Sequence, residues 1–146
     1  MPPLNSIVRR QVKQVLFVCH GNTCRSVMAA YIVSSRFPQN IKAQSAGLCP
    51  GAPSDALNAI DTLRAHRIDA SGHVPRDVRD VDISTFDVVV AMDSAVARQF
   101  KKLFPNFDTA RLATWRIQDP YGDDLSEYEI CANRIHREVD RLRQNL

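Results

Sequence analysis

Short, uninterrupted apolar runs recur along the chain, and stretches with helical spacing of apolar residues separate them. The run Val15–Cys19 is rich in β-branched and aromatic residues, which is typical of a strand buried on both faces. Phe86–Met92 contains a second such run, Val88-Val-Val-Ala91, and shorter strands are expected at Ile41–Ser45 and Arg111–Thr114. The apolar pattern therefore predicts four strands.

The intervening stretches predict four helices: Ser26–Arg36, Gly51-Ala-Pro-Ser54 to about Ala65, Ser94–Leu103 and Ser126–Arg143. In the second of these helices, one face is expected to carry Ala56, Leu57, Ile60 and Leu63. In the last helix, an apolar stripe is formed by Tyr128, Cys131, Ile135, Val139 and Leu142. The alternation of strands and helices predicts an α/β fold, a parallel sheet with helices on both faces. Ligands of such sheets bind beyond the carboxyl ends of the strands.

The segment Cys19-His-Gly-Asn-Thr-Cys-Arg-Ser26 begins where the first expected strand ends. A loop between a strand and a helix directs backbone N–H groups and the positive end of the helix dipole at one point, which favours an anion. A cysteine at that point is expected to be a nucleophilic thiolate, and Arg25 offers a planar guanidinium suited to two phosphoryl oxygens. The segment predicts a thiolate nucleophile in a phosphate-binding loop.

The spacing of cysteine and arginine is not specific alone, since Cys131 and Arg137 repeat it. That second copy follows no strand, contains no glycine and lies on the apolar stripe of the last helix, so Cys131 is expected in the core. The first copy contains Gly21 and Asn22, which tolerate the backbone conformations that an inward-facing loop requires.

The Cys19–Ser26 segment, following an apolar strand, resembles the phosphate-binding loop of the low molecular weight protein tyrosine phosphatases. Asp119-Pro120-Tyr121 resembles the general-acid loop of that family, and four further motifs fall where the family has similar residues: Ser45-Ala-Gly47, His73-Val-Pro-Arg76, Phe86-Asp87 and Met92-Asp93. The resemblance extends from about Lys13 to Leu142 and implies a flavodoxin-like, four-stranded parallel sheet. Two features depart from the family pattern: Val27 stands where proline is usual, and residues 1–13 form an N-terminal extension before a single phosphatase domain, 14–146.

The resemblance implies hydrolysis of protein phosphotyrosine and aryl phosphates through a cysteinyl-phosphate intermediate. Cys19 would be the nucleophile, Arg25 would bind phosphate and stabilise the transition state, and Asp119 would be the general acid and later the base. Phosphate-binding or entrance positions are expected at His20, Gly21, Asn22, Thr23, Cys24, Ser26 and Tyr121. Ordinary structural roles are the alternatives: a buried cysteine, a helix N-cap at Ser26, a turn aspartate at Asp119 and a packing tyrosine.

Supporting roles are also implied by the resemblance. Asn22, Ser45 and His73 resemble residues that hydrogen-bond the loop into shape. Cys24 resembles a cysteine that pairs reversibly with the nucleophile and protects it from over-oxidation, the alternative being a small packing residue. No cofactor and no metal are expected, because the spacing of Cys19, His20 and Cys24 does not match common structural zinc sites.

Composition narrows the function further. The 146 residues, 45% hydrophobic and 24% charged, suit one globular domain, and a net charge of +3 does not favour nucleic acid. No run has the length of a membrane span, and no signal peptide is recognisable at the start. Four cysteines without an export signal favour the cytoplasm, and a monomer without membrane partners is expected.

Two other functions fit the same loop. Arsenate reduction would use it to hold arsenate, but the additional cysteine pair of thioredoxin-linked members has no counterpart in Ala91–Gln99. A module that binds phosphotyrosine without turnover would be expected to lack Cys19, Arg25 or Asp119, and all three are present. A phosphotyrosine protein is the expected partner, and a tyrosine kinase of polysaccharide export is one candidate.

Overall fold

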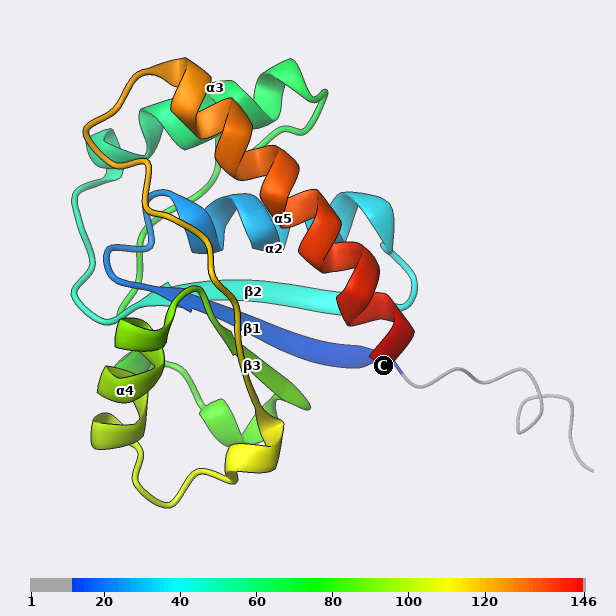
Figure 1. The fold of residues 1–146 in the computed structure, drawn as a ribbon, viewed down its shortest axis with the longest axis vertical. Helices are drawn as coiled ribbons and strands as arrows, with labels where there is room; N and C mark the ends of the chain where they lie inside the picture. Colours follow the sequence, from blue (N-terminus) through cyan, green and yellow to red (C-terminus); the bar gives the residue numbers. More distant parts are fainter. Residues whose placement is uncertain (1–11, 146) are drawn as a thin grey trace, which may run out of the picture.

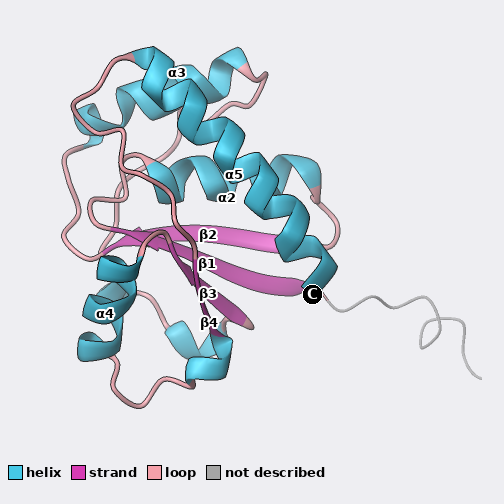
Figure 2. Cartoon of the chain, in the orientation of Figure 1, coloured by secondary structure: helices cyan, strands magenta, loops and turns pink. Residues whose placement is uncertain are grey.

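The computed structural model describes residues 12–145, which contain a parallel sheet of four strands with helices on both faces (Figures 1 and 2). The strands are β1 (Lys13–Cys19), β2 (Ile41–Gly47), β3 (Val88–Ala91) and β4 (Leu112–Thr114). Their spatial order is β2-β1-β3-β4, and every neighbouring pair is parallel. The predicted flavodoxin-like α/β fold is confirmed. Of the expected N-terminal extension, residues 1–11 lie outside the described part of the chain.

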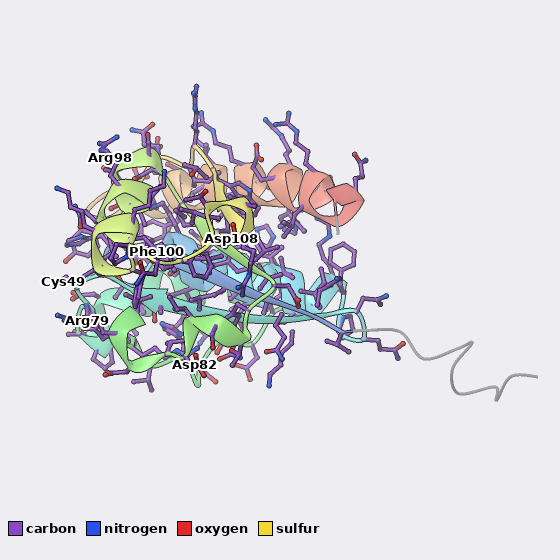
Figure 3. The ribbon with its side chains drawn as sticks, turned by 90° about the horizontal axis from the view of Figure 1, so that it is seen from below. Cys49, Arg79, Asp82, Arg98, Phe100 and Asp108 are labelled. Carbon is purple, nitrogen blue, oxygen red and sulfur yellow. The ribbon has the colours of Figure 1, made fainter. Side chains whose placement is uncertain are left out.

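The helices form a layer on each side of this sheet. Helices α2 (Arg25–Arg36), α3 (Leu57–Ala65) and α5 (Leu125–Asn145) cover one face, and α4 (Ser94–Leu103) covers the other (Figure 1). Short 3₁₀ turns, η1 to η4, lie at Pro53–Ala56, Val78–Asp80, Ile83–Thr85 and Thr109–Arg111. In Figure 3, which shows the molecule from below, Phe100 lies on α4, where its side chain is completely buried.

Strand β1 is buried on both faces because successive side chains point to opposite sides of a strand. Val15 and Phe17 pack into the core beneath α2 and α5, whereas Leu16 and Val18 pack beneath α4. All four side chains are fully buried. The uninterrupted apolar run that predicted this strand therefore reflects its position in the middle of the sheet.

The apolar stripe predicted for the last helix is confirmed, and it holds α5 against α2 and α3. Tyr128, Cys131, Ile135, Val139 and Leu142 are all buried. Cys131 is thus a core residue, as predicted for the second cysteine–arginine pair. Across residues 12–145, no helix combines the length and apolarity that crossing a membrane requires.

Most element boundaries differ from the predictions by only one or two residues, and the largest differences are in the second predicted helix and the third strand. The helix expected from Gly51 to Ala65 divides into η1, with Pro53 at its start, and α3. Within α3, Leu57 points away from the buried face and is 57% exposed, while Ala59 and Leu63 are buried. The expected strand at Phe86–Met92 forms as β3 over Val88–Ala91, and the flanking backbone N–H groups of Asp87 and Met92 still donate to the Gln14 and Val18 carbonyl oxygens of β1.

Candidate active site

The segment Cys19–Ser26 lies at the carboxyl end of β1 and runs directly into α2, which begins at Arg25. The strand order reverses at β1, since β2 lies on one side of it and β3 on the other (Figure 2). Such a switch point is where open parallel sheets bind ligands, and a helix N-terminus there favours anions. The loop is therefore placed as the sequence predicted.

Asn22 determines the shape of this loop. Its backbone is left-handed, with φ of 54°, and the residue is fully buried. Its side-chain amide donates to Ser26 Oγ at 2.9 Å, and its Oδ1 accepts from the backbone N–H of Arg76 at 3.0 Å. Its carbonyl oxygen lies 2.8 Å from His73 Nε2, and its own N–H donates to Cys19 Sγ at 3.3 Å. One residue thus joins the loop, the following helix and the Gly72–Arg76 segment.

The Cys19 sulfur is buried and receives hydrogen bonds from two sides. Ser26 Oγ lies 2.9 Å from Cys19 Sγ, and the N–H of Asn22 approaches the same sulfur. Because the Asn22 amide already donates to Ser26 Oγ, the hydroxyl proton of Ser26 is available to the sulfur. Two hydrogen-bond donors are therefore directed at the Cys19 sulfur.

The segment that follows β2 supports the loop through its backbone. The N–H groups of Leu48, Cys49 and Gly51 donate to the carbonyl oxygens of Cys19, His20 and Gly21 at 3.1, 2.8 and 2.9 Å. The His20 side chain is exposed and Thr23 is buried, while Cys49 is exposed at the same end of the molecule as Arg79 (Figure 3). These bonds leave the loop's carbonyls turned away from the anion site.

Gly47 allows β2 to approach the loop closely, a role that the sequence did not reveal. A β-carbon at this position would lie 2.9 Å from both the Asn22 nitrogen and the His20 carbonyl oxygen. The motif Ser45-Ala-Gly47 marked the segment only by family likeness. Ser45 is buried, and its carbonyl oxygen accepts from Arg76 Nε at 3.0 Å, so it contacts the segment that anchors Asn22.

Arg25 has a buried guanidinium that, among residues 12–145, hydrogen-bonds through Nη1 only. Nη1 donates to Asp93 Oδ2 at 2.6 Å and to the carbonyl oxygen of Ile117 at 3.0 Å. Nε is buried and has no hydrogen-bond partner within the described residues. A buried N–H without a partner is costly, so this group favours an oxyanion that could accept from it.

Asp93 fixes the orientation of Arg25, and sequence reasoning assigned it no role in the site. Burial raises the pKa of Asp93, but the hydrogen bonds from Arg25 and from the Val96 backbone outweigh it, so the pKa lies below its usual value. The available signal was its position: Asp93 follows β3 directly and caps α4, at the carboxyl end of the strand beside β1.

Asp119 lies opposite the loop on the segment between β4 and α5. Its Oδ2 is 3.6 Å from Arg25 Nη2, and its Oδ1 accepts from the Tyr121 backbone at 3.0 Å. The Asp119 side chain is 47% exposed. Tyr121 is largely exposed, and its hydroxyl donates to Asp55 Oδ1 at 3.4 Å.

His73 and Cys24 line the interior side of the loop. Burial lowers the pKa of His73, so its neutral ring donates Nε2–H to the Asn22 carbonyl. Cys24 is buried with its thiol 3.2 Å from the Tyr128 hydroxyl, and burial raises the pKa of that thiol.

All four cysteines are free, so none of them forms a disulfide. Over residues 12–145, no three His, Cys, Asp or Glu side chains are grouped to hold a metal ion.

A parallel α/β sheet with a cysteine–arginine anion loop at its switch point defines a class of phosphatase. The family model described as "Low molecular weight phosphotyrosine protein phosphatase" matches residues 14–146, and the chain belongs to this family.

Individual relatives cover almost the whole chain. The chain is 30% identical over 136 residues to the probable low molecular weight protein-tyrosine-phosphatase EpsP of Ralstonia nicotianae, with 88% of this chain and 92% of that protein covered. A solved low molecular weight protein tyrosine phosphatase from T. tengcongensis matches with a TM-score of 0.82 and 31% identity, covering 92% and 99% of the two chains. The YwlE arginine phosphatase from Geobacillus stearothermophilus has the same TM-score with 27% identity, covering 91% and 92%.

Proposed function

We propose that the chain is a cysteine-dependent phosphatase that hydrolyses phosphotyrosine in proteins. The observation that carries this proposal is the buried, unpartnered Nε of Arg25 beside the hydrogen-bonded sulfur of Cys19. A phosphoryl group bound in the loop would accept from this Nε and from the loop's backbone N–H groups.

In the first step, Cys19 Sγ attacks phosphorus in line with the leaving oxygen. The S–P bond forms as the P–O bond to tyrosine breaks, and protonated Asp119 gives its proton to the leaving oxygen. Arg25 follows the phosphoryl oxygens into the transition state, where charge on them is greatest. The ion pair between Arg25 Nη2 and Asp119, at 3.6 Å, opens when the phosphoryl group binds.

In the second step, a water molecule attacks the cysteinyl-phosphate, and Asp119 takes one of its protons. The S–P bond breaks, inorganic phosphate leaves, and the sulfur regains its negative charge. The hydroxyl of Ser26, 2.9 Å from the sulfur, donates to the departing thiolate. His20, Gly21, Asn22, Thr23 and Cys24 contribute the backbone of the loop.

Tyr121 supports an aromatic substrate, because its exposed ring stands beside Asp119 and could stack on phosphotyrosine. Phosphoarginine in proteins is a second candidate substrate. It is favoured by the Asp55 carboxylate beside the Tyr121 hydroxyl, because this carboxylate would attract a guanidinium leaving group. A tyrosine kinase of polysaccharide export is the protein substrate that we propose to examine first, given the likeness to phosphatase EpsP.

The first test is hydrolysis of para-nitrophenyl phosphate near pH 6 with EDTA present. Cys19→Ser is expected to abolish turnover, and Asp119→Ala to reduce it about a hundredfold to ten-thousandfold. Arg25→Ala and Arg137→Ala form a matched pair, because each arginine stands six residues after a cysteine, and only the first is expected to lose activity. Inactive, fully reduced wild-type protein would refute the proposal and make arsenate reduction with thiol donors the next assay.

The substrate class is tested next with phosphotyrosine and phosphoarginine peptides of the same sequence. The proposal expects a higher kcat/KM for phosphotyrosine, and Tyr121→Ala is expected to reduce that preference. A higher kcat/KM for phosphoarginine that falls in Asp55→Asn would favour the second candidate.

A further inference from the structure

A second pocket, with a volume of about 370 Å³, opens beside the edge strand β2, and Cys19, Arg25 and Asp119 do not line it. Its walls come from α2, from β2 and from the segment His73–Arg76. This volume lies within the range of sites that bind small molecules, roughly 300–1,000 Å³. Its lining is mixed, because small or apolar residues alternate with a larger number of polar side chains: Tyr31, Ser34, Gln44, Ser45, His73 and Arg76.

Two aromatic side chains line the pocket together. The rings of Tyr31 and His73 meet edge to face, with centroids 6.2 Å apart. Ala43 contributes a small side chain nearby, and Val74, which also lines the pocket, is 67% exposed. A flat ring placed there would contact two aromatic groups and displace water from apolar surface.

Arg76 and Gln44, which also line the pocket, offer hydrogen-bond donors. Arg76 is held by two bonds, from Nε to the Ser45 carbonyl at 3.0 Å and from Nη2 to Gln44 Oε1 at 2.6 Å. Because Gln44 accepts through its oxygen, its amide N–H groups remain free to donate. Arg76 Nη1 forms no hydrogen bond within residues 12–145, and its guanidinium is planar, which suits a carboxylate.

The charged groups around the pocket also favour a ligand carboxylate beside Arg76. Burial, together with the nearby Asp69 carboxylate, raises the pKa of Tyr31, so its hydroxyl keeps its proton and is a donor. The Asp69 carboxylate accepts from the backbone of Ser71 and does not line the pocket. A negative group of a ligand is therefore favoured beside the Arg76 guanidinium and disfavoured beside Tyr31, because the Asp69 carboxylate lies near Tyr31.

We propose that this pocket binds a small aromatic carboxylate, with the ring against Tyr31 and His73 and the carboxylate at Arg76 and Gln44. The site is separate from the phosphatase chemistry and does not depend on it. It does adjoin the phosphate-binding loop, because His73 and the Arg76 backbone also hold Asn22.

The experiment follows the amide NMR signals of the ¹⁵N-labelled full chain during titration with benzoate. Excess inorganic phosphate is present, so that the anion loop is occupied. Signals of Gln44 and Val74 are expected to shift in a saturable way, with Kd of about 1 mM, as is usual for a ligand of this size. Acetate, which lacks the ring, and benzyl alcohol, which lacks the carboxylate, are expected to bind at least about tenfold more weakly.

Arg76→Met removes the guanidinium but keeps the backbone N–H that holds Asn22. It is expected to raise Kd for benzoate about tenfold or more, the cost of losing a charged hydrogen bond. Arg79→Met is the matched control, because Arg79 is exposed, pairs with Asp77 and does not line the pocket. Its Kd should equal that of wild type.

Three results would overturn the proposal: no saturable shift around the pocket, shifts confined to Cys19–Ser26, or an unchanged Kd in folded Arg76→Met. The comparison of benzoate, acetate and benzyl alcohol uses wild-type protein, so it decides the matter even if Arg76→Met does not fold. Equal affinity for all three compounds would also refute the proposed positions of the ring and of the carboxylate.

Discussion

Gly47→Ala tests whether close approach of β2 shapes the phosphate-binding loop. The added β-carbon would lie 2.9 Å from the Asn22 nitrogen and from the His20 carbonyl oxygen, whereas ordinary contact begins at 3.4 Å. The loop must therefore move by about 0.5 Å, and both contacted atoms are backbone, which cannot rotate away. Overpacking of this kind costs about 1–3 kcal/mol of unfolding free energy. A half-ångström displacement of the loop is expected to lower kcat/KM about tenfold.

The assay combines urea unfolding with para-nitrophenyl phosphate kinetics and inhibition by inorganic phosphate. Gly72→Ala is the matched control, because a β-carbon there meets no atom within 4 Å. Its unfolding free energy should stay within about 0.5 kcal/mol of wild type, with unchanged kinetics. If folded Gly47→Ala has wild-type kcat/KM and wild-type affinity for phosphate, the steric argument is refuted.

Three further outcomes are expected. Asp93→Asn should lower kcat/KM about tenfold to a hundredfold, because Arg25 loses its charged partner; unchanged kinetics would contradict this positioning role. After peroxide treatment, wild type should recover in dithiothreitol and Cys24→Ser should not, if Cys24 pairs with Cys19; equal recovery would exclude the pairing. Burial, together with the charges of neighbouring residues, lowers the pKa of His136 in the folded protein below the ordinary 6.5. Below that pH the unfolded chain binds more protons than the folded protein does, so the free energy of unfolding falls as the pH drops. His136→Gln should lose less stability than wild type in urea unfolding across that range, and an identical decline would refute the assignment.

Local pattern predicted most of the fold. The run at Val15–Cys19 and the stripe on α5 were correct because burial on a strand or helix imposes a period that the sequence displays. Leu57 was assigned to the wrong face, because at about 100° per residue it lies about 120° around the helix from Leu63. The helical period, applied residue by residue, places Ala56, Ala59 and Leu63 together and leaves Leu57 outside their face.

In the candidate site, the residues within the loop motif were predicted, and two residues that the fold brings to the loop from elsewhere were not given a role. Within Cys19–Ser26, the residues are close in sequence, and the motif itself indicated their proximity. Asp93 and Gly47 act on this segment from other strands, through a hydrogen bond to a guanidinium and through the absence of a side chain. The position of Asp93 directly after a strand was the available signal for it, whereas Gly47 left none, because its effect depends on how closely β2 approaches the loop in space.

The ion pair between Arg25 and Asp119 has a consequence for turnover under the proposed reaction. In the free protein, Asp119 already occupies one side of the Arg25 guanidinium, at 3.6 Å from Nη2. Inorganic phosphate must displace this carboxylate to remain bound, and the carboxylate competes for the same donor when phosphate loosens. The general acid would thus limit product inhibition, and Asp119→Asn would hold inorganic phosphate more tightly than wild type does.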